Sequence, residues 1–112
     1  MGFKATHRWA RISPRKAGLV MTMIRGRSVD EALVILDFSP QRAGKLISKV
    51  IRSAVANADE QEAAMESLYV AQARADEGPV MKRISMRARG AMDVIRKPSC
   101  HLLIELEERP GT

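Results

Sequence analysis

The chain has 112 residues, enough for one hydrophobic core and too few for two domains. Its hydrophobic fraction of 46% is ordinary for a globular protein, whereas its net charge of +6 indicates a polyanionic partner. One cysteine excludes an intrachain disulfide and a thiolate metal cluster, and no apolar run reaches the roughly 20 residues of a membrane-spanning helix.

The first elements in chain order are a strand and a helix. Ser13-Pro14 marks the helix start, because Ser caps a helix and Pro is tolerated at its first position. Gly26 then ends this helix. The preceding strand is predicted over residues 3–12 from alternating side chains, with one face formed by Phe3, Ala5, His7 and Trp9.

Two further helices follow. Ser28 and Glu31 form a capping box that begins a short helix ending near Phe38. Ser39-Pro40 repeats the start signal and begins the longest helix, whose apolar stripe keeps helical spacing throughout. That stripe consists of Ala43, Leu46, Ile47, Val50, Ile51, Ala54, Val55 and Ala58.

A second face of the longest helix carries a row of positive charges. Arg42, Lys45, Lys49 and Arg52 recur at three- and four-residue steps, with no acid between them. Such a row is usually solvated surface, but here no i,i+4 ion pairs can offset the repulsion. Nearby phosphates would offset it.

Two strands are predicted in the second half of the chain, over residues 68–75 and 101–106. Asp76-Glu77-Gly78-Pro79 ends the first of them, and residues 109–112 are expected to be frayed. The side chains expected to share a face are Tyr69, Ala71 and Ala73 in the first strand, and Leu102, Ile104 and Leu106 in the second.

The segment between these strands, residues 79–97, is the most informative part of the chain. It holds six Lys/Arg and one acid, Asp93. It fits a hairpin with arms of about nine residues, which at about 3.3 Å per residue would project roughly 30 Å. Because an isolated two-stranded ribbon is marginal in water, we expect a polyanionic partner to order it. The alternative is a disordered basic loop.

The chain lacks recognisable catalytic motifs, so we predict neither enzymatic activity nor a cofactor. Cys100 and His101 are a poor dyad, because neighbours on a strand point to opposite faces. His7 and His101 lie far apart in the sequence, and no carboxylates stand near them at the spacing of zinc ligands. We therefore predict no metal site.

Two N-terminal patterns indicate alternative readings. Residues 1–29 are rich in Lys and Arg and contain no acid, as in a transit peptide. Residues 1–6 also match the loose myristoylation pattern at Gly2, which would make the chain a lipidated membrane-surface protein. Both patterns often match by chance, so we favour a mature basic N-terminus.

Several short motifs resemble one family across residues 4–108. Each motif is weak alone, but chance matches would not keep their order and spacing over nearly the whole chain. Together they resemble the bacterial-type large-subunit ribosomal protein number twenty-two family. The motifs are Ser13-Pro14-Arg15-Lys16, Ile24-Arg25-Gly26, Glu31-Ala32-Leu33, Lys49-Val50, Ser53-Ala54-Val55-Ala56-Asn57-Ala58, Asp76-Glu77-Gly78-Pro79, Lys82-Arg83, Arg87-Ala88-Arg89-Gly90 and His101.

The resemblance implies an α+β fold over residues 1–112, in which a three-stranded antiparallel sheet packs with three helices and a long β-hairpin protrudes over residues 79–97. It implies a structural constituent of the large ribosomal subunit in the cytoplasm of a bacterium, with an organelle still open. The implied partners are large-subunit ribosomal RNA and neighbouring ribosomal proteins, with no membrane. The hairpin of family members lines the polypeptide exit tunnel, beside the nascent polypeptide and near the macrolide site.

The resemblance and the charge pattern together suggest two groups of contact residues. The expected RNA-binding residues are Lys4, Arg8, Arg11, Arg15, Lys16, Arg25, Arg27, Lys45, Lys49, Arg52, Lys82, Arg83, Arg87, Arg89, Arg96 and Lys97. The residues expected at the tunnel-hairpin tip are Met81, Lys82, Arg83, Arg87, Arg89 and Gly90.

The chain departs from the family pattern after Gly90, where the family usually has more basic residues and a Lys/Arg-Thr-Ser-His ending. Here Ala91, Met92, Val94, Pro98 and Cys100 stand instead. The departure leaves the phosphate contacts of the returning arm open. A free-standing nucleic-acid chaperone or nucleoid protein is the alternative function.

Overall fold

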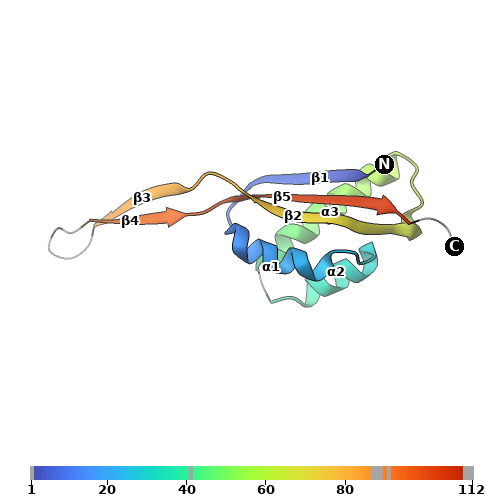
Figure 1. Cartoon of the computed structure of the whole chain (residues 1–112), viewed down its shortest axis with the longest axis horizontal. Coiled ribbons are helices and arrows are strands. Elements are labelled where there is room, and N and C mark those ends of the chain that lie inside the picture. The colour runs from blue at the N-terminus through green and yellow to red at the C-terminus, as the bar shows by residue number, and fades with distance from the viewer. Residues whose placement is uncertain (1, 41, 87–89, 91, 110–112) are drawn as a thin grey trace.

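The computed structural model describes residues 2–40, 42–86, 90 and 92–109. A body of strands and helices carries a hairpin at one end, and the molecule measures 68 × 25 × 16 Å (Figure 1). The elements are β1 (Phe3–Ala10), α1 (Pro14–Ile24), α2 (Val29–Phe38), α3 (Arg42–Glu60), a 3-10 turn (Met65–Ser67), β2 (Leu68–Glu77), β3 (Met81–Met86), β4 (Met92–Lys97) and β5 (Cys100–Glu108).

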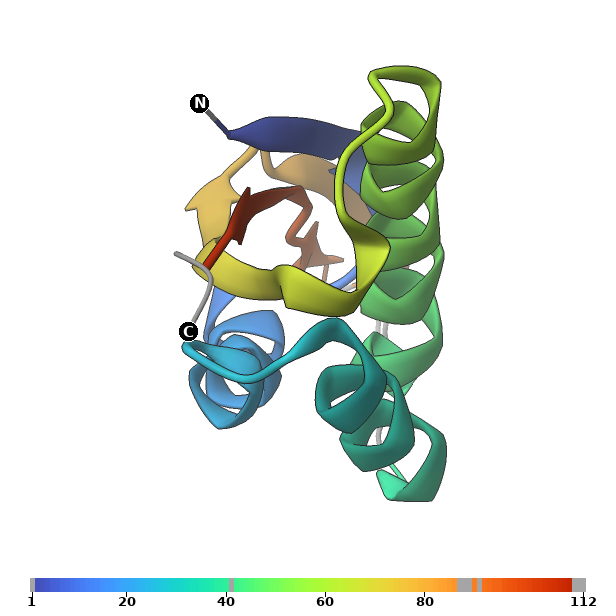
Figure 2. The same cartoon turned by 90° about the vertical axis from the view of Figure 1, so that its right-hand side faces the viewer.

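The body is built on a three-stranded antiparallel sheet in the order β1-β5-β2. The central strand β5 buries Leu102, Ile104 and Leu106 completely, as its alternation predicts. Figure 2 shows α3 along one side of the sheet and α1 and α2 beneath β2, so the core lies between the sheet and the helices. The predicted α+β class is confirmed.

The predicted start and stop signals of α1 are confirmed. The Ser13 hydroxyl accepts a hydrogen bond from the Lys16 N–H at 3.2 Å, and Pro14 is the first helical residue. Gly26 follows the helix with a φ of 77°, a conformation that glycine adopts without a steric penalty. Its N–H donates to the Val70 carbonyl at 2.9 Å, which ties the end of α1 to β2.

The second and third helices also follow their patterns. The Ser28 hydroxyl accepts from the Glu31 N–H at 3.3 Å, while the Glu31 carboxylate lies 3.8 Å from the Arg27 guanidinium. The structure describes α3 from Arg42, so the start expected at Ser39-Pro40 borders on residue 41, outside the described residues. The predicted stripe of α3 faces the core, fully buried or packed against it.

The prediction that Trp9 shares the buried face of the first strand is wrong. The pairing of β1 with β5 shifts register between His7 and Ala10, and Trp9 has a φ of 62°. This bulge turns the Trp9 side chain outward, where 61% of it is exposed, and buries Ala10 instead.

A second bulge changes the expected pattern of β2. Its pairing with β5 shifts register between Val70 and Gln72, which leaves Ala71 as the extra residue. Leu68 and Val70 are therefore buried before the bulge and Ala73 after it. The prediction that Ala71 and Ala73 share a face is wrong, since Ala71 is exposed.

The hairpin extends the β2–β5 pair beyond the sheet. Glu77 is the last residue of β2 and pairs with Cys100, and the antiparallel β3–β4 pair begins with Met81 opposite Lys97. A short neck, residues 78–80 and 98–99, separates the two ladders. There the Gly78 N–H donates to the Ser99 carbonyl at 3.0 Å.

Candidate nucleic-acid interface

Two basic rows lie side by side on β1 and α3. The Asn57 amide donates to the Lys4 carbonyl at 2.9 Å, and the Arg42 guanidinium donates to the Arg11 carbonyl at 3.4 Å. These bonds join opposite ends of the two elements, so β1 and α3 run in opposite directions along one edge of the body. We call the exposed cations of the two rows the α3–β1 basic surface; they are Lys4, Arg8, Arg11, Arg42, Lys45, Lys49 and Arg52.

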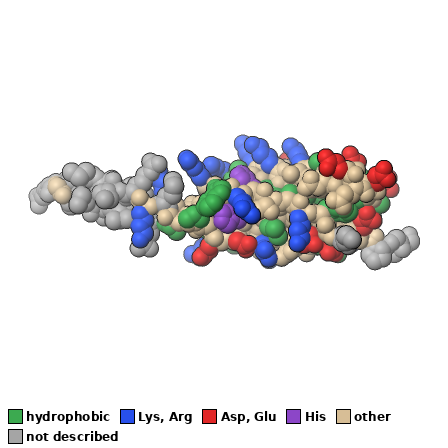
Figure 3. Space-filling view, turned by 90° about the horizontal axis from the view of Figure 1, so that it is seen from above, with side chains coloured by type: hydrophobic (Ala, Val, Ile, Leu, Met, Phe, Trp, Pro, Cys, Tyr) green, Lys and Arg blue, Asp and Glu red, His purple; other side chains and the backbone are tan. Residues whose placement is uncertain are grey.

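No acid lies between the cations of the α3–β1 basic surface in either element. In the sequence, residues 3–11 and 42–58 hold no Asp or Glu, and the first acids of α3 are Asp59 and Glu60 at its end. Among the described residues, none of the seven cations forms an ion pair with an acid. Figure 3 shows Lys and Arg over the middle of the body and most Asp and Glu toward the end away from the hairpin. The body is therefore electrically polarised.

Helices α1 and α3 each carry basic residues in the first turn, where the helix dipole favours an acid. Arg15 and Lys16 are exposed in the first turn of α1, and Arg42 begins the described part of α3. Neither first turn contains an acid. A cation at a helix N-terminus is unfavourable by roughly 0.3–1 kcal/mol in an exposed setting. A bound anion would remove this cost.

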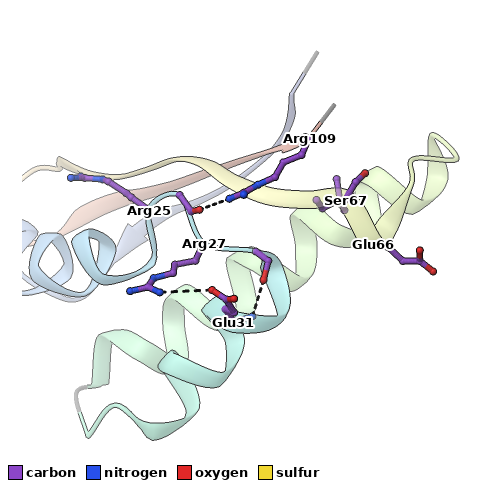
Figure 4. Close-up of a pocket in the computed structure, with 9 residues that line it drawn as sticks. Arg25, Arg27, Glu31, Glu66, Ser67 and Arg109 are labelled. Carbon is purple, nitrogen blue, oxygen red and sulfur yellow. Dashed lines mark hydrogen bonds and ion pairs between the residues drawn. The ribbon is translucent and has the colours of Figure 1, made fainter. Parts of the chain in front are cut away.

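A polar hollow of about 570 Å³ lies between the end of α1, the start of α2 and the end of β5 (Figure 4). Three arginines line it. Arg25 donates from Nε to the Ala73 carbonyl at 2.8 Å, whereas Arg27 lies 3.8 Å from the Glu31 carboxylate. Two predicted RNA-binding residues thus have partners within the body, so they are less available to phosphate than Lys45, Lys49 and Arg52 of α3, which form no ion pair among the described residues.

The third arginine of this hollow, Arg109, was not among the predicted contact residues. Its guanidinium donates to the Gly26 carbonyl at 2.6 Å and lies 4.7 Å from the centroid of the Tyr69 ring. Its N–H also donates to the Ser67 carbonyl at 2.9 Å. The expectation that the chain is frayed from Arg109 onward is therefore wrong at that residue, and residues 110–112 lie outside the described part. No local pattern signals these contacts, because all three partners are distant in sequence.

The hairpin residues expected at the tip do not all lie there. Met81, Lys82 and Arg83 begin β3, next to the neck, so their expected place at the tip is wrong. Gly90 lies between β3 and β4, exposed and with a φ of 74°. Arg87 and Arg89 lie outside the described residues.

Three further expected contact residues belong to the paired strands of the hairpin. Arg96 pairs across the ladder with Lys82, and Lys97 pairs with Met81. The side chains of Lys82 and Lys97 are exposed. The base of the hairpin therefore presents positive charge on both of its strands.

The neighbouring thiol and imidazole point apart, as the strand geometry predicts. Cys100 is completely buried, and this burial raises the pKa of its thiol. His101 instead meets Trp9 on the other face, with ring centroids 5.0 Å apart. Within the described ranges, no group of three or more His, Cys, Asp or Glu side chains could hold a metal ion, and no helix is long and apolar enough to cross a membrane.

Comparison with known proteins points to one family. A family model described as "Ribosomal protein L22p/L17e" matches residues 5–107. The chain is 49% identical over 110 residues to the "Large ribosomal subunit protein uL22" of Thermoanaerobacter sp. (strain X514), an alignment that covers 97% of this chain and 99% of the relative. The identity is 46%, with the same coverage, for the protein of that name in Clostridioides difficile (strain 630).

Proposed function

This chain belongs to the ribosomal protein L22p/L17e family, and we propose on that basis that it is a structural constituent of the large ribosomal subunit that binds large-subunit ribosomal RNA. One observation carries the proposal beyond family membership. The α3–β1 basic surface is free of acids and continues toward a basic hairpin that leaves the body. The location of the protein is then the cytoplasmic ribosome, and neighbouring ribosomal proteins are its other partners.

The chemistry of this role is charge neutralisation and positioning. Lys and Arg side chains displace the counterions of phosphates, which supplies most of the sequence-independent affinity for nucleic acid. A-form RNA hides its base edges in a deep, narrow major groove. The body is therefore expected to recognise the arrangement of RNA helices through their backbones.

The hairpin provides the long-range part of the role. Its two strands extend past the sheet, and an isolated two-stranded ribbon has little stability of its own in water. RNA on both sides would hold it in place, and in return it would brace RNA segments that are distant in sequence. We further propose that it lines the polypeptide exit tunnel, in contact with the nascent polypeptide and near the macrolide site, as the family resemblance suggests.

Sedimentation tests the role of the whole chain. A native lysate is fractionated on a sucrose gradient, and the large-subunit peak is then washed with high salt and probed for this chain. Retention in stoichiometric amount is expected, because a hairpin enclosed between RNA segments adds packing contacts that salt does not screen, whereas phosphate contacts alone weaken steeply as salt rises. Recovery at the top of the gradient, or release by modest salt, would contradict the proposal and favour a free nucleic-acid chaperone.

A set of variants tests whether the hairpin itself contacts RNA. Replacing Arg83, Arg87 and Arg89 with alanine is expected to lower the salt dependence of binding to transcribed large-subunit ribosomal RNA by about 0.7–0.9 in log–log slope per lost phosphate contact. The melting of the body is expected to stay the same. An unchanged slope would remove these three arginines from the interface.

A further inference from the structure

Trp9 is held in an unusual conformation at the point where the body meets the hairpin. Its φ of 62° lies in the left-handed region, which is a genuine outlier for a bulky side chain. Its indole is 61% exposed, although a large aromatic ring gains most from burial. The strand thus holds an aromatic ring on the outside at a cost in conformational free energy. Backbone strain of this kind clusters at functional sites.

The central strand fixes this conformation through His101. The backbone N–H of Trp9 donates to His101 Nδ1 at 3.2 Å, so Nδ1 is the acceptor of this bond. The two rings meet edge to face, with centroids 5.0 Å apart and an angle of 87° between their planes. His101 therefore holds both the backbone and the ring of Trp9 while leaving most of the indole uncovered.

Along β1, the neighbours of Trp9 carry positive charge, while the exposed Asp76 of β2 lies across from His101. Arg8 precedes it and Arg11 follows two residues later, and both side chains are exposed. Both belong to the α3–β1 basic surface, and no acid occurs in the first 29 residues. Figure 3 shows hydrophobic and histidine side chains together on this face, with Lys and Arg around them and Asp or Glu along one side. An exposed aromatic ring among cations matches the combination that proteins use to bind single-stranded nucleic acid.

We propose that the indole of Trp9 is a stacking platform for an unpaired base of RNA, with Arg8 and Arg11 neutralising the phosphates beside that base. This inference rests on the proposed RNA-binding function and adds a base contact to a surface that otherwise contacts only phosphate. A protein partner is disfavoured because interface aromatics usually lie in a patch depleted of charge, whereas this ring has cations on both sides along the strand.

The fluorescence of Trp9 provides a direct test, because it is the only tryptophan of the chain. The full-length protein is titrated with single-stranded oligoadenylate and, separately, with inorganic polyphosphate of matched charge. Binding is followed independently by the anisotropy of an end-labelled oligoadenylate, with polyphosphate as a competitor. Oligoadenylate is expected to quench the emission on binding. Polyphosphate is expected to compete without quenching, since it has no base to stack.

Two substitutions of Trp9 separate stacking from backbone geometry. Trp9→Phe keeps a ring, whereas Trp9→Asn removes it but tolerates the left-handed conformation. A base–aromatic stack is worth roughly fivefold to a hundredfold or more in affinity. We expect Trp9→Asn to weaken oligoadenylate binding by roughly tenfold and Trp9→Phe by much less. Neither is expected to change the salt slope, whereas Arg8→Ala is expected to lower it by about 0.7.

The outcomes distinguish the stacking proposal from RNA binding itself. RNA binding without quenching, and with equal affinity for Trp9→Asn, would overturn the stacking proposal, leave RNA binding intact and direct attention to a protein neighbour of Trp9. Equal quenching by polyphosphate would also overturn it. No binding of oligoadenylate or of transcribed large-subunit ribosomal RNA would contradict both proposals. Thermal melting of each variant verifies that the bulge still folds.

Discussion

The α3–β1 basic surface predicts that one set of substitutions will weaken RNA binding and strengthen the fold. In the described part of the chain, the four cations of α3 are exposed and form no ion pair. Their spacing makes each cation the helical neighbour of the next, which gives three like-charge pairs. The substituted variant replaces Lys45, Lys49 and Arg52 with alanine together, which removes all three pairs and keeps the Arg42 hydrogen bond to the Arg11 carbonyl.

The size of both effects follows from the geometry. Each like-charge pair on a helix surface costs about 0.2–0.5 kcal/mol, so removing three pairs should raise the free energy of unfolding by roughly 1 kcal/mol. Salt screening reduces this gain. If each of the three cations contacts one phosphate, the log–log salt slope of RNA binding should fall by about 2–3. The affinity lost between about 50 and 200 mM salt would then shrink by roughly thirtyfold.

Two measurements on the same protein test this prediction. Urea unfolding gives the free energy of unfolding, and filter binding of transcribed large-subunit ribosomal RNA at several salt concentrations gives the slope. Arg74→Ala is the matched control, because Arg74 is exposed but lies 3.2 Å from the Asp76 carboxylate. A destabilised variant, or a slope no different from that of the control, would refute the reasoning that these charges are arranged for phosphate.

Four further predictions concern the body, the neck and the hairpin. The hydrogen bond to Glu107 and burial raise the pKa of Tyr69 above 10.0, so its phenolate absorbance should appear at higher pH in the native protein than in urea, and Glu107→Gln should lower that pKa. Because the pKa of Tyr69 is higher in the folded than in the unfolded protein, its neutral form stabilises the fold. This contribution to the free energy of unfolding is complete below pH 10 and is lost as the pH rises through the folded pKa. A Cβ at Gly78 would lie 2.8 Å from a serine hydroxyl of the neck, so Gly78→Ala should reduce the free energy of unfolding by about 1 kcal/mol. Gly18→Ala meets open space in α1 and should raise it by about 0.5–1 kcal/mol. Deleting residues 80–96 should leave a body that melts cooperatively, and a broad transition would show that the hairpin belongs to the core.

The helices were predictable because their signals are local. Ser13 and Ser28 cap their helices through bonds to residues three positions later, and such contacts depend only on the neighbouring sequence. The apolar stripe of α3 is long enough to average out exceptions. The row of cations on α3 was predictable for the same reason, since the spacing of charges along one helix fixes the face that they share, whereas its place beside β1 follows only from the packing.

The bulges were not predictable, because nothing in the local sequence signals them. Trp9 and Ala71 each sit where the register against β5 shifts by one residue. Period-two reading assumes an unbroken ladder, so one extra residue reverses every assignment after it. The conformation of Trp9 depends on His101, which lies 92 residues away in sequence. Only the folded pairing of β1 with β5 brings this acceptor to it.

The neck explains how a long hairpin can leave the stability of the body unchanged. Pro79 and Pro98 have no N–H to donate, so the ladder between β2 and β5 cannot continue unbroken into β3 and β4. Gly78 permits the close approach to Ser99, whose hydroxyl donates to the Pro79 carbonyl at 2.6 Å. The neck thus keeps the strands together while interrupting the cooperative ladder. Fraying of the β3–β4 ladder would then have little effect on the core, and we expect bound RNA to hold the hairpin in place.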